Sequence, residues 1–80
     1  MKHPVMIPSL GLVESVTVTG WLKKTGERVA KSENVVTIET EKSSVDIESP
    51  MDGILEIAIA AGPELVSADA VLGYVDDGAA

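Results

Sequence analysis

The residue with the clearest capacity for chemistry is Lys42, which lies near the middle of the 80-residue chain. It separates two segments, 35–40 and 44–48, in which apolar and polar residues alternate. Alternation with a period of two predicts β-strands, so the join between them should be a hairpin with Glu41 and Lys42 near its tip. Since neither residue is Gly or Asn, a mirror-image turn is not expected, and a type I turn fits better.

An exposed amine at a hairpin tip is suited to covalent attachment of a prosthetic group. A modifying enzyme can reach it there, and a rigid sheet gives it a fixed position. The prosthetic group then supplies the reactivity, and the protein presents it. The alternative is an ordinary solvated lysine, as we expect of Lys23, Lys24 and Lys31. Lys42 differs from these because it lies where two similar halves of the chain meet.

The two halves match each other at a displacement of 36 residues. Gly26, at a predicted turn, aligns with Gly62, and Trp21 aligns with Ile57. The other apolar matches are Val29 on Leu65, Val35 on Val71, Val36 on Leu72 and Ile38 on Tyr74. Generic β patterning could produce part of this match. Two copies of one strand–turn–strand unit predict a quasi-twofold fold in which the halves pack face to face.

Short runs of β-branched and apolar residues, separated by Gly and Pro, predict an all-β domain. The runs expected to be strands are 5–7, 15–19, 35–40, 44–48, 54–59 and 71–75. Many short strands at close spacing favour a sandwich or a barrel. Trp21 and Tyr74 are the only aromatic residues, and we expect Trp21 to pack in the fold rather than to hold a ligand.

Composition excludes several classes of function. Cysteine is absent and the one histidine, His3, is expected to be solvated, which leaves no basis for a Cys- or His-rich metal site or a Ser-His-Asp set. A net charge of −7 disfavours nucleic acid and anionic membrane surfaces as partners. On folding, a domain of this size buries only about 60–65% of the surface that its unfolded chain exposes. This leaves little room for a deep enzyme pocket beside the core. We therefore expect a carrier or binding module in the cytoplasm, or in the mitochondrial matrix of a eukaryote.

The segment Glu39-Thr40-Glu41-Lys42-Ser43 resembles the lipoylation motif of lipoyl domains, with Glu41 where Asp is more common. The resemblance extends to Pro8-Ser9-Leu10-Gly11, to the stretch from Trp21 to Val29, and to Ser49-Pro50-Met51-Asp52-Gly53. It covers roughly residues 4 to 75, nearly the whole chain. The chain is thereby identified as similar to the biotinyl and lipoyl carrier family, and to its lipoyl members in particular.

This resemblance implies a flattened β-barrel of two four-stranded sheets related by a quasi-twofold axis. It implies lipoic acid attached covalently at Lys42, with Glu39, Glu41 and Ser43 contributing to recognition by the lipoylating enzyme. It also implies a partner-recognition loop beside the hairpin, formed by Ser9, Leu10, Gly11, Leu12, Val13, Glu14 and Ser15. The alternative for Leu12 or Val13 is inward packing in the core. No catalytic residue and no metal ligand are expected.

Lipoyl domains of this kind belong to the acyltransferase component of 2-oxoacid dehydrogenase complexes. The implied partners are a thiamine-diphosphate-dependent dehydrogenase, the acyltransferase catalytic domain, dihydrolipoyl dehydrogenase and a lipoate ligase. Residues 1–75 would form the carrier domain, monomeric by itself, and residues 76–80 would begin an interdomain linker. The short stretch from Gly11 to Trp21 slightly favours a pyruvate-type complex.

Three alternatives stay open at this point. A biotinyl domain shares the fold, but biotin acceptors resemble Ala-Met-Lys-Met, whereas Lys42 has Glu41 and Ser43 as neighbours. The lipoate-bearing carrier of the glycine cleavage system is longer and has additional helical segments. An unmodified β assembly module would leave Lys42 merely solvated, and a failure of lipoate ligase to modify the chain would favour it.

Overall fold

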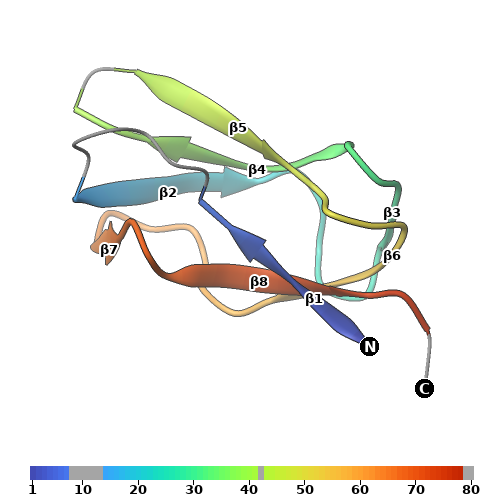
Figure 1. The fold of residues 1–80 in the computed structure, drawn as a ribbon. Coiled ribbons are helices and arrows are strands. Elements are labelled where there is room, and N and C mark those ends of the chain that lie inside the picture. Colours follow the sequence, from blue (N-terminus) through green and yellow to red (C-terminus); the bar gives the residue numbers. More distant parts are fainter. Residues whose placement is uncertain (8–13, 42, 79–80) are drawn as a thin grey trace.

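The computed structural model describes residues 1–7, 14–41 and 43–78, and none of these residues forms a helix. No segment in the described ranges is therefore a helix long and apolar enough to cross a membrane. The described part folds into eight strands (Figure 1). They are β1 (Lys2–Met6), β2 (Ser15–Trp21), β3 (Arg28–Val29), β4 (Asn34–Glu39), β5 (Ser44–Glu48), β6 (Gly53–Ile57), β7 (Leu65–Ser67) and β8 (Val71–Asp76).

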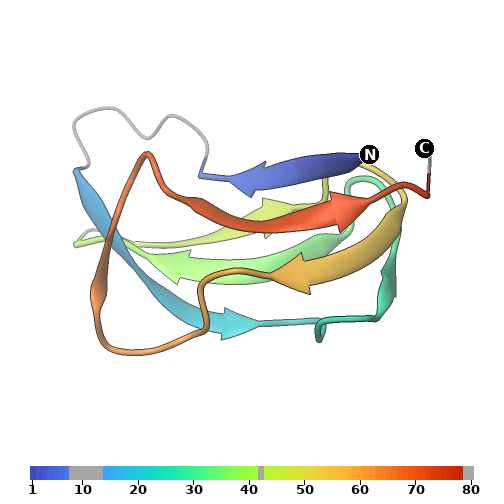
Figure 2. The same cartoon turned by 90° about the horizontal axis from the view of Figure 1, so that it is seen from below.

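The strands form two antiparallel four-stranded sheets, in the orders β1-β8-β6-β3 and β5-β4-β2-β7. Replacing each strand by the one four places away in the chain converts the first order into the second. This exchange is what a quasi-twofold axis produces, so the predicted two-sheet fold and its internal symmetry are confirmed. The first and last strands, β1 and β8, are neighbours, with Lys2 paired with Asp76 (Figure 2). That end of the molecule is opposite the β4–β5 hairpin (Figure 1).

The displacement between most equivalent strand residues is 37, one more than the sequence match suggested. Thr17 pairs with Leu65, and the equivalent pair in the other sheet is Ile54 with Arg28. The inward residues equivalent to Val29, Val35 and Ile38 are therefore Val66, Leu72 and Val75. The predicted matches of these three to Leu65, Val71 and Tyr74 are wrong by one position, and Leu65 faces outward.

A bulge explains why the turns nevertheless match at 36. Strand β2 has a register shift between Val18 and Gly20, which adds one residue to the first half. Two equivalent hydrogen bonds show the result: Gly26 N–H donates to the Leu55 carbonyl at 2.8 Å, and Gly62 N–H donates to the Val18 carbonyl at 3.0 Å. The glycines are 36 residues apart and their acceptors 37. A displacement that changes along the chain cannot be recovered from a single best offset.

The core lies between the two sheets and consists of aliphatic side chains. Its buried members are Val5, Ile7, Val16, Val18, Val29, Val35, Val36, Ile38, Ile47, Leu55, Leu72 and Val75. Complete burial of such a side chain stabilises the fold by about 1.5–3 kcal/mol. Trp21 packs against this cluster, as predicted, and a Cβ at Gly73 would lie only 3.1 Å from its ring. Gly73 thus makes room for the indole.

Strand boundaries depart from the prediction mainly where strands are short or lie at a sheet edge. The structure begins the first strand at Lys2, and Pro4 is accommodated because β1 is an edge strand. Strands β3 and β7, with two and three residues, were not predicted.

The expectation of a solvated His3 is wrong: its partly buried ring contacts Asp77, with Nε2 2.7 Å from a carboxylate oxygen. Contacts between the first and last strands thus include Asp76, which pairs with Lys2, and Asp77, which His3 contacts.

Candidate functional site

The β4–β5 hairpin lies where the sequence predicted it. Glu39 and Ser44 form the last cross-strand pair before the turn. Beyond them, Thr40 N–H donates to the Ser43 carbonyl at 2.8 Å. The Thr40 hydroxyl also donates to that carbonyl at 3.0 Å and accepts from Ser43 N–H at 3.2 Å. One threonine therefore fixes both ends of the turn between Thr40 and Ser43.

The backbone of Glu41 excludes the mirror-image hairpin turns. Among the residues that the structure describes, Ser32 is the only non-glycine residue with a positive φ, at 69°. Type I′ and type II′ turns both require a positive φ at the first central position, which Glu41 occupies. The expectation that this hairpin does not use a mirror-image turn is confirmed. Lys42 itself lies outside the described residues.

Most of the predicted partner-recognition loop also lies outside the described residues. This applies to Ser9, Leu10, Gly11, Leu12 and Val13. Its last two residues, Glu14 and Ser15, are described and exposed. They are held in place by β7, because Ser15 pairs with Ser67 and the Glu14 carbonyl accepts from Ala68 N–H at 2.9 Å. The end of this loop is thus anchored to the sheet that carries the hairpin.

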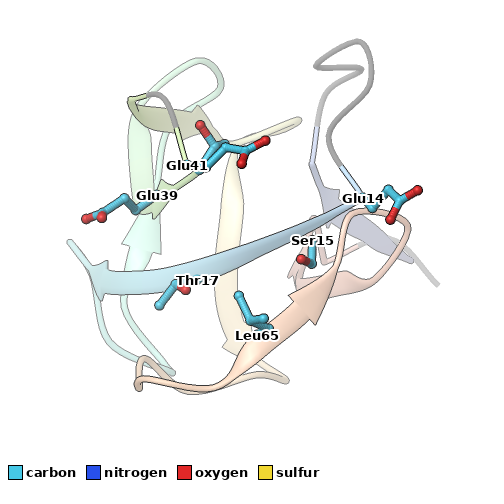
Figure 3. A pocket seen from close by; sticks show the side chains of 7 residues that line it. Glu14, Ser15, Thr17, Glu39, Glu41 and Leu65 are labelled. Atoms are coloured by element: carbon cyan, nitrogen blue, oxygen red, sulfur yellow. The ribbon is translucent and has the colours of Figure 1, made fainter.

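The structure brings these two predicted regions together in one groove, with a volume of about 490 Å³. Figure 3 shows Glu39 and Glu41 on one side of β2, Leu65 on the other, and Glu14 at the beginning of the strand. The lining consists of Glu14, Ser15, Thr17, Glu39, Thr40, Glu41 and Leu65. Three carboxylates and one large apolar side chain therefore surround an open depression beside the hairpin.

Sequence reasoning missed Thr17, Thr40 and Leu65 as members of this groove. Thr17 occupies an outward position in an alternating strand, which would have placed it on the surface but not beside Glu39. The sequence match had aligned Leu65 with Val29, a buried residue, because the repeat was taken one residue out of register. Ser43, predicted to contribute to recognition by the lipoylating enzyme, is exposed at the turn but does not line the groove.

The ion pairs on the described surface lie outside the groove. The ion pairs found among described residues involve Glu33, Glu56, Asp76 and Asp77, none of which lines the groove. Two of these carboxyls have pKa values below their usual range. A hydrogen bond from Ala30 N–H and contact with Lys23 lower the pKa of Glu33, and a hydrogen bond from Gly78 N–H is the main cause for Asp76. Glu33 and Asp76 thus both lie away from the hairpin, because Glu33 precedes the first residue of β4 and Asp76 ends β8.

The arrangement at the hairpin is suited to presenting an attached group. No group of three or more His, Cys, Asp or Glu side chains in the described part is arranged to hold a metal ion. The hairpin instead offers an exposed, hydrogen-bonded turn with small and acidic residues around position 42. Such a site can be approached by a modifying enzyme from outside and is held steady by the sheet behind it.

Comparison with known proteins adds the family context. Residues 3–75 match a family model for biotin and lipoyl attachment, described as "Biotin-requiring enzyme". The chain is 42% identical to the dihydrolipoyllysine-residue succinyltransferase component of the 2-oxoglutarate dehydrogenase complex of Bartonella vinsonii subsp. berkhoffii, over all of this chain and 20% of that protein. It is 33% identical to the dihydrolipoyllysine-residue acetyltransferase component of the acetoin cleaving system of Pseudomonas putida, over 98% of this chain and 21% of that protein.

A third relative is the dihydrolipoyllysine-residue acetyltransferase component of the pyruvate dehydrogenase complex of Pseudomonas aeruginosa. It is 30% identical over 95% of this chain and 14% of that protein. The chain thus spans about a fifth or less of the length of these curated relatives.

Proposed function

Since this chain belongs to the family of biotin- and lipoyl-carrying domains, we propose that it is a lipoyl carrier domain modified at Lys42. The observation that carries the proposal is the exposed turn that the hydrogen bonds between Thr40 and Ser43 close, at the point in the sequence where this lysine occurs. The names of the relatives support lipoic acid as the attached group, because each name includes the term dihydrolipoyllysine residue.

The residues around position 42 fit a lipoyl group. Attachment requires only an amide bond between the lysine amine and the lipoate carboxyl, so a free path for the ligase matters more than a shaped cavity. The described neighbours are consistent with that need, because Glu41 and Ser43 are both exposed. When attached, lipoic acid supplies a dithiolane disulfide that accepts an acyl group and two electrons. Thr40 and the Glu39–Ser44 pair keep the turn in position.

The parent protein is proposed to be the acyltransferase component of a 2-oxoacid dehydrogenase complex. Its partners would be the thiamine-diphosphate-dependent dehydrogenase, the acyltransferase catalytic domain, dihydrolipoyl dehydrogenase and the lipoate ligase. By name, the relatives described above are components of a 2-oxoglutarate dehydrogenase complex, an acetoin cleaving system and a pyruvate dehydrogenase complex. A pyruvate-type complex, which the length of the segment 11–21 slightly favours, stays a prediction.

Intact mass measurement tests the proposal directly. The chain is incubated with lipoate, ATP and a lipoate ligase, beside the variants Lys42→Arg and Lys24→Arg. Lys24 is an exposed lysine in another turn and serves as the matched control. We expect one lipoyl increment on the wild type and on Lys24→Arg, and none on Lys42→Arg.

Two outcomes would contradict this proposal. An increment that persists in Lys42→Arg would show that another amine is the acceptor. No increment on a folded wild-type chain, with the ligase active on a control substrate, would remove the lipoyl function. A biotin ligase assay on the same samples would then separate a biotinyl carrier from an unmodified assembly module.

A further inference from the structure

The outer faces of the two quasi-equivalent sheets differ in charge at the same row of positions. In the sheet β3-β6-β8-β1, the row is Arg28, Ile54, Asp76 and Lys2. In the sheet β7-β2-β4-β5, the equivalent row is Leu65, Thr17, Glu39 and Ser44. The first row places two bases around one carboxylate. The second row keeps a carboxylate at the equivalent position but has no base, and Leu65 replaces Arg28.

Leu65 is unusual for a strand residue on a polar face. Its side chain is 73% exposed and is the most exposed of the large apolar side chains in the described part. Its cross-strand neighbour is Thr17, beyond which lies Glu39. Nothing in the fold requires leucine here, since the inward position of this strand is occupied by Val66.

Among the described residues that line the groove, the carboxylates around Leu65 have no base beside them. Glu14, Glu39 and Glu41 line the same groove, and no Lys or Arg is among the residues that line it. An open groove with three carboxylates around one apolar side chain is complementary to a surface that carries Arg or Lys beside an apolar residue. A second copy of this chain is a poor occupant, because its net charge of −7 would bring like charges together.

We propose that this groove, with Leu65 as its apolar contact, is the docking surface for the dehydrogenase that acylates the lipoyl group. The inference rests on the proposed function, because it assigns a partner to the lipoyl hairpin that the groove adjoins. The partner contributes a basic segment with an apolar side chain that covers Leu65. Its basic residues face Glu14, Glu39 and Glu41, which steer the approach and orient the domain with the hairpin toward the partner's active site.

The test separates docking from lipoylation. Wild type and variants are first lipoylated to completion, and intact mass verifies the modification. Each is then offered to the first components of 2-oxoglutarate, acetoin and pyruvate dehydrogenase complexes with their substrates. The dehydrogenase that acylates the wild type fastest is used to measure kcat/KM.

The variant Leu65→Ser removes the apolar contact, and Leu22→Ser is its control. Leu22 is the same residue type, is 54% exposed and lies beyond the other end of β2. We expect Leu65→Ser to lower kcat/KM roughly fivefold or more, mainly through KM, because truncation of a central interface residue has effects of this size. Leu22→Ser should match the wild type. Both should retain the wild-type melting temperature.

The variant Glu14→Gln tests the charge, with Glu48→Gln at the far end of β5 as its control. We expect Glu14→Gln to lower kcat/KM at low ionic strength and to weaken the decline of kcat/KM with added salt. Glu48→Gln should have a smaller effect on both.

Wild-type kcat/KM for Leu65→Ser, or an equal loss for Leu22→Ser, would overturn the docking surface while leaving lipoylation intact. A wild-type dimer in sedimentation that Leu65→Ser makes monomeric would also overturn it, in favour of a second copy as the occupant. Failure of the wild type to become lipoylated would remove the proposed function itself, at an earlier step of the same experiment.

Discussion

The indole N–H of Trp21 donates a hydrogen bond to the carbonyl oxygen of Ile59 at 2.8 Å. Trp21 ends β2 in the first half of the chain, and Ile59 follows β6 in the second half. The bond therefore joins the two quasi-equivalent halves. Each half has a single aromatic residue, Trp21 in the first and Tyr74 in the second. It also fixes the orientation of the indole, whose ring lies against Gly73.

Replacement of Trp21 by Phe should reduce the free energy of unfolding by about 1–3 kcal/mol. The change leaves the Ile59 carbonyl without its donor and removes part of the ring that fills the space above Gly73. Urea unfolding monitored by far-UV circular dichroism measures the effect. Tyr74→Phe is the control, because it alters the other aromatic residue, whose hydroxyl forms no hydrogen bond with any residue that the structure describes. An equal loss in both variants would mean that the indole N–H has no specific role.

Replacement of Thr40 by Val should slow lipoylation while changing global stability by less than about 1.5 kcal/mol. The variant loses the hydroxyl that contacts both the carbonyl and the N–H of Ser43, so the turn is held less firmly. Initial rates of lipoate incorporation, followed by intact mass, measure the effect. Thr19→Val provides the control, since it also loses a threonine-to-carbonyl hydrogen bond, at 2.9 Å to Thr37, but outside the turn. Identical rates for both variants would show that ligase does not depend on the fixed turn.

Exchange of the two central turn residues, by Glu41→Lys combined with Lys42→Glu, should abolish lipoylation. The composition and net charge are unchanged, but the amine moves one position along the hairpin, where a side chain points in a different direction. Mass spectrometry after ligase treatment measures the modification, and the melting temperature verifies that the fold is retained. Efficient modification of the exchanged variant would indicate that the ligase reads the exposed amine alone.

The carboxyl of Glu33 should make stability dependent on acid pH. The hydrogen bond from Ala30 N–H, followed by contact with Lys23, lowers its pKa below the ordinary value of 4.5. A lowered folded-state pKa contributes stability above the unfolded value, and that contribution is lost as pH falls through the folded pKa. Glu33→Gln should therefore lower the melting temperature at neutral pH and reduce its decline below pH 4.5. The measurement is thermal unfolding from pH 7 to pH 2.

Glu48→Gln is the control for the loss of one negative charge. Glu48 is exposed and takes part in none of the ion pairs found among the described residues. If both variants shift the pH profile equally, the effect comes from net charge and not from the Ala30 and Lys23 contacts.

Much of the architecture was predictable because β-strands leave a local signal. Alternation in 35–40 and 44–48 reflects side chains that face the core and solvent in turn, and it located the hairpin around Lys42. The repeat between the halves likewise predicted the quasi-twofold arrangement. Strands β3 and β7 escaped detection because two or three residues are too few to show a period, and only pairing with β6 and β2 makes them strands.

The sequence by itself determined the class of fold, the position of the hairpin and the family, since these follow from local alternation and from motif residues adjacent in the chain. Tertiary structure decided the register between the halves, because the bulge after Val18 changes the displacement from 37 to 36 partway along β2. It also decided that Leu65 faces outward beside Thr17 and Glu39. Those three residues come from three strands far apart in sequence, and the backbone hydrogen bonds that align the strands bring them together.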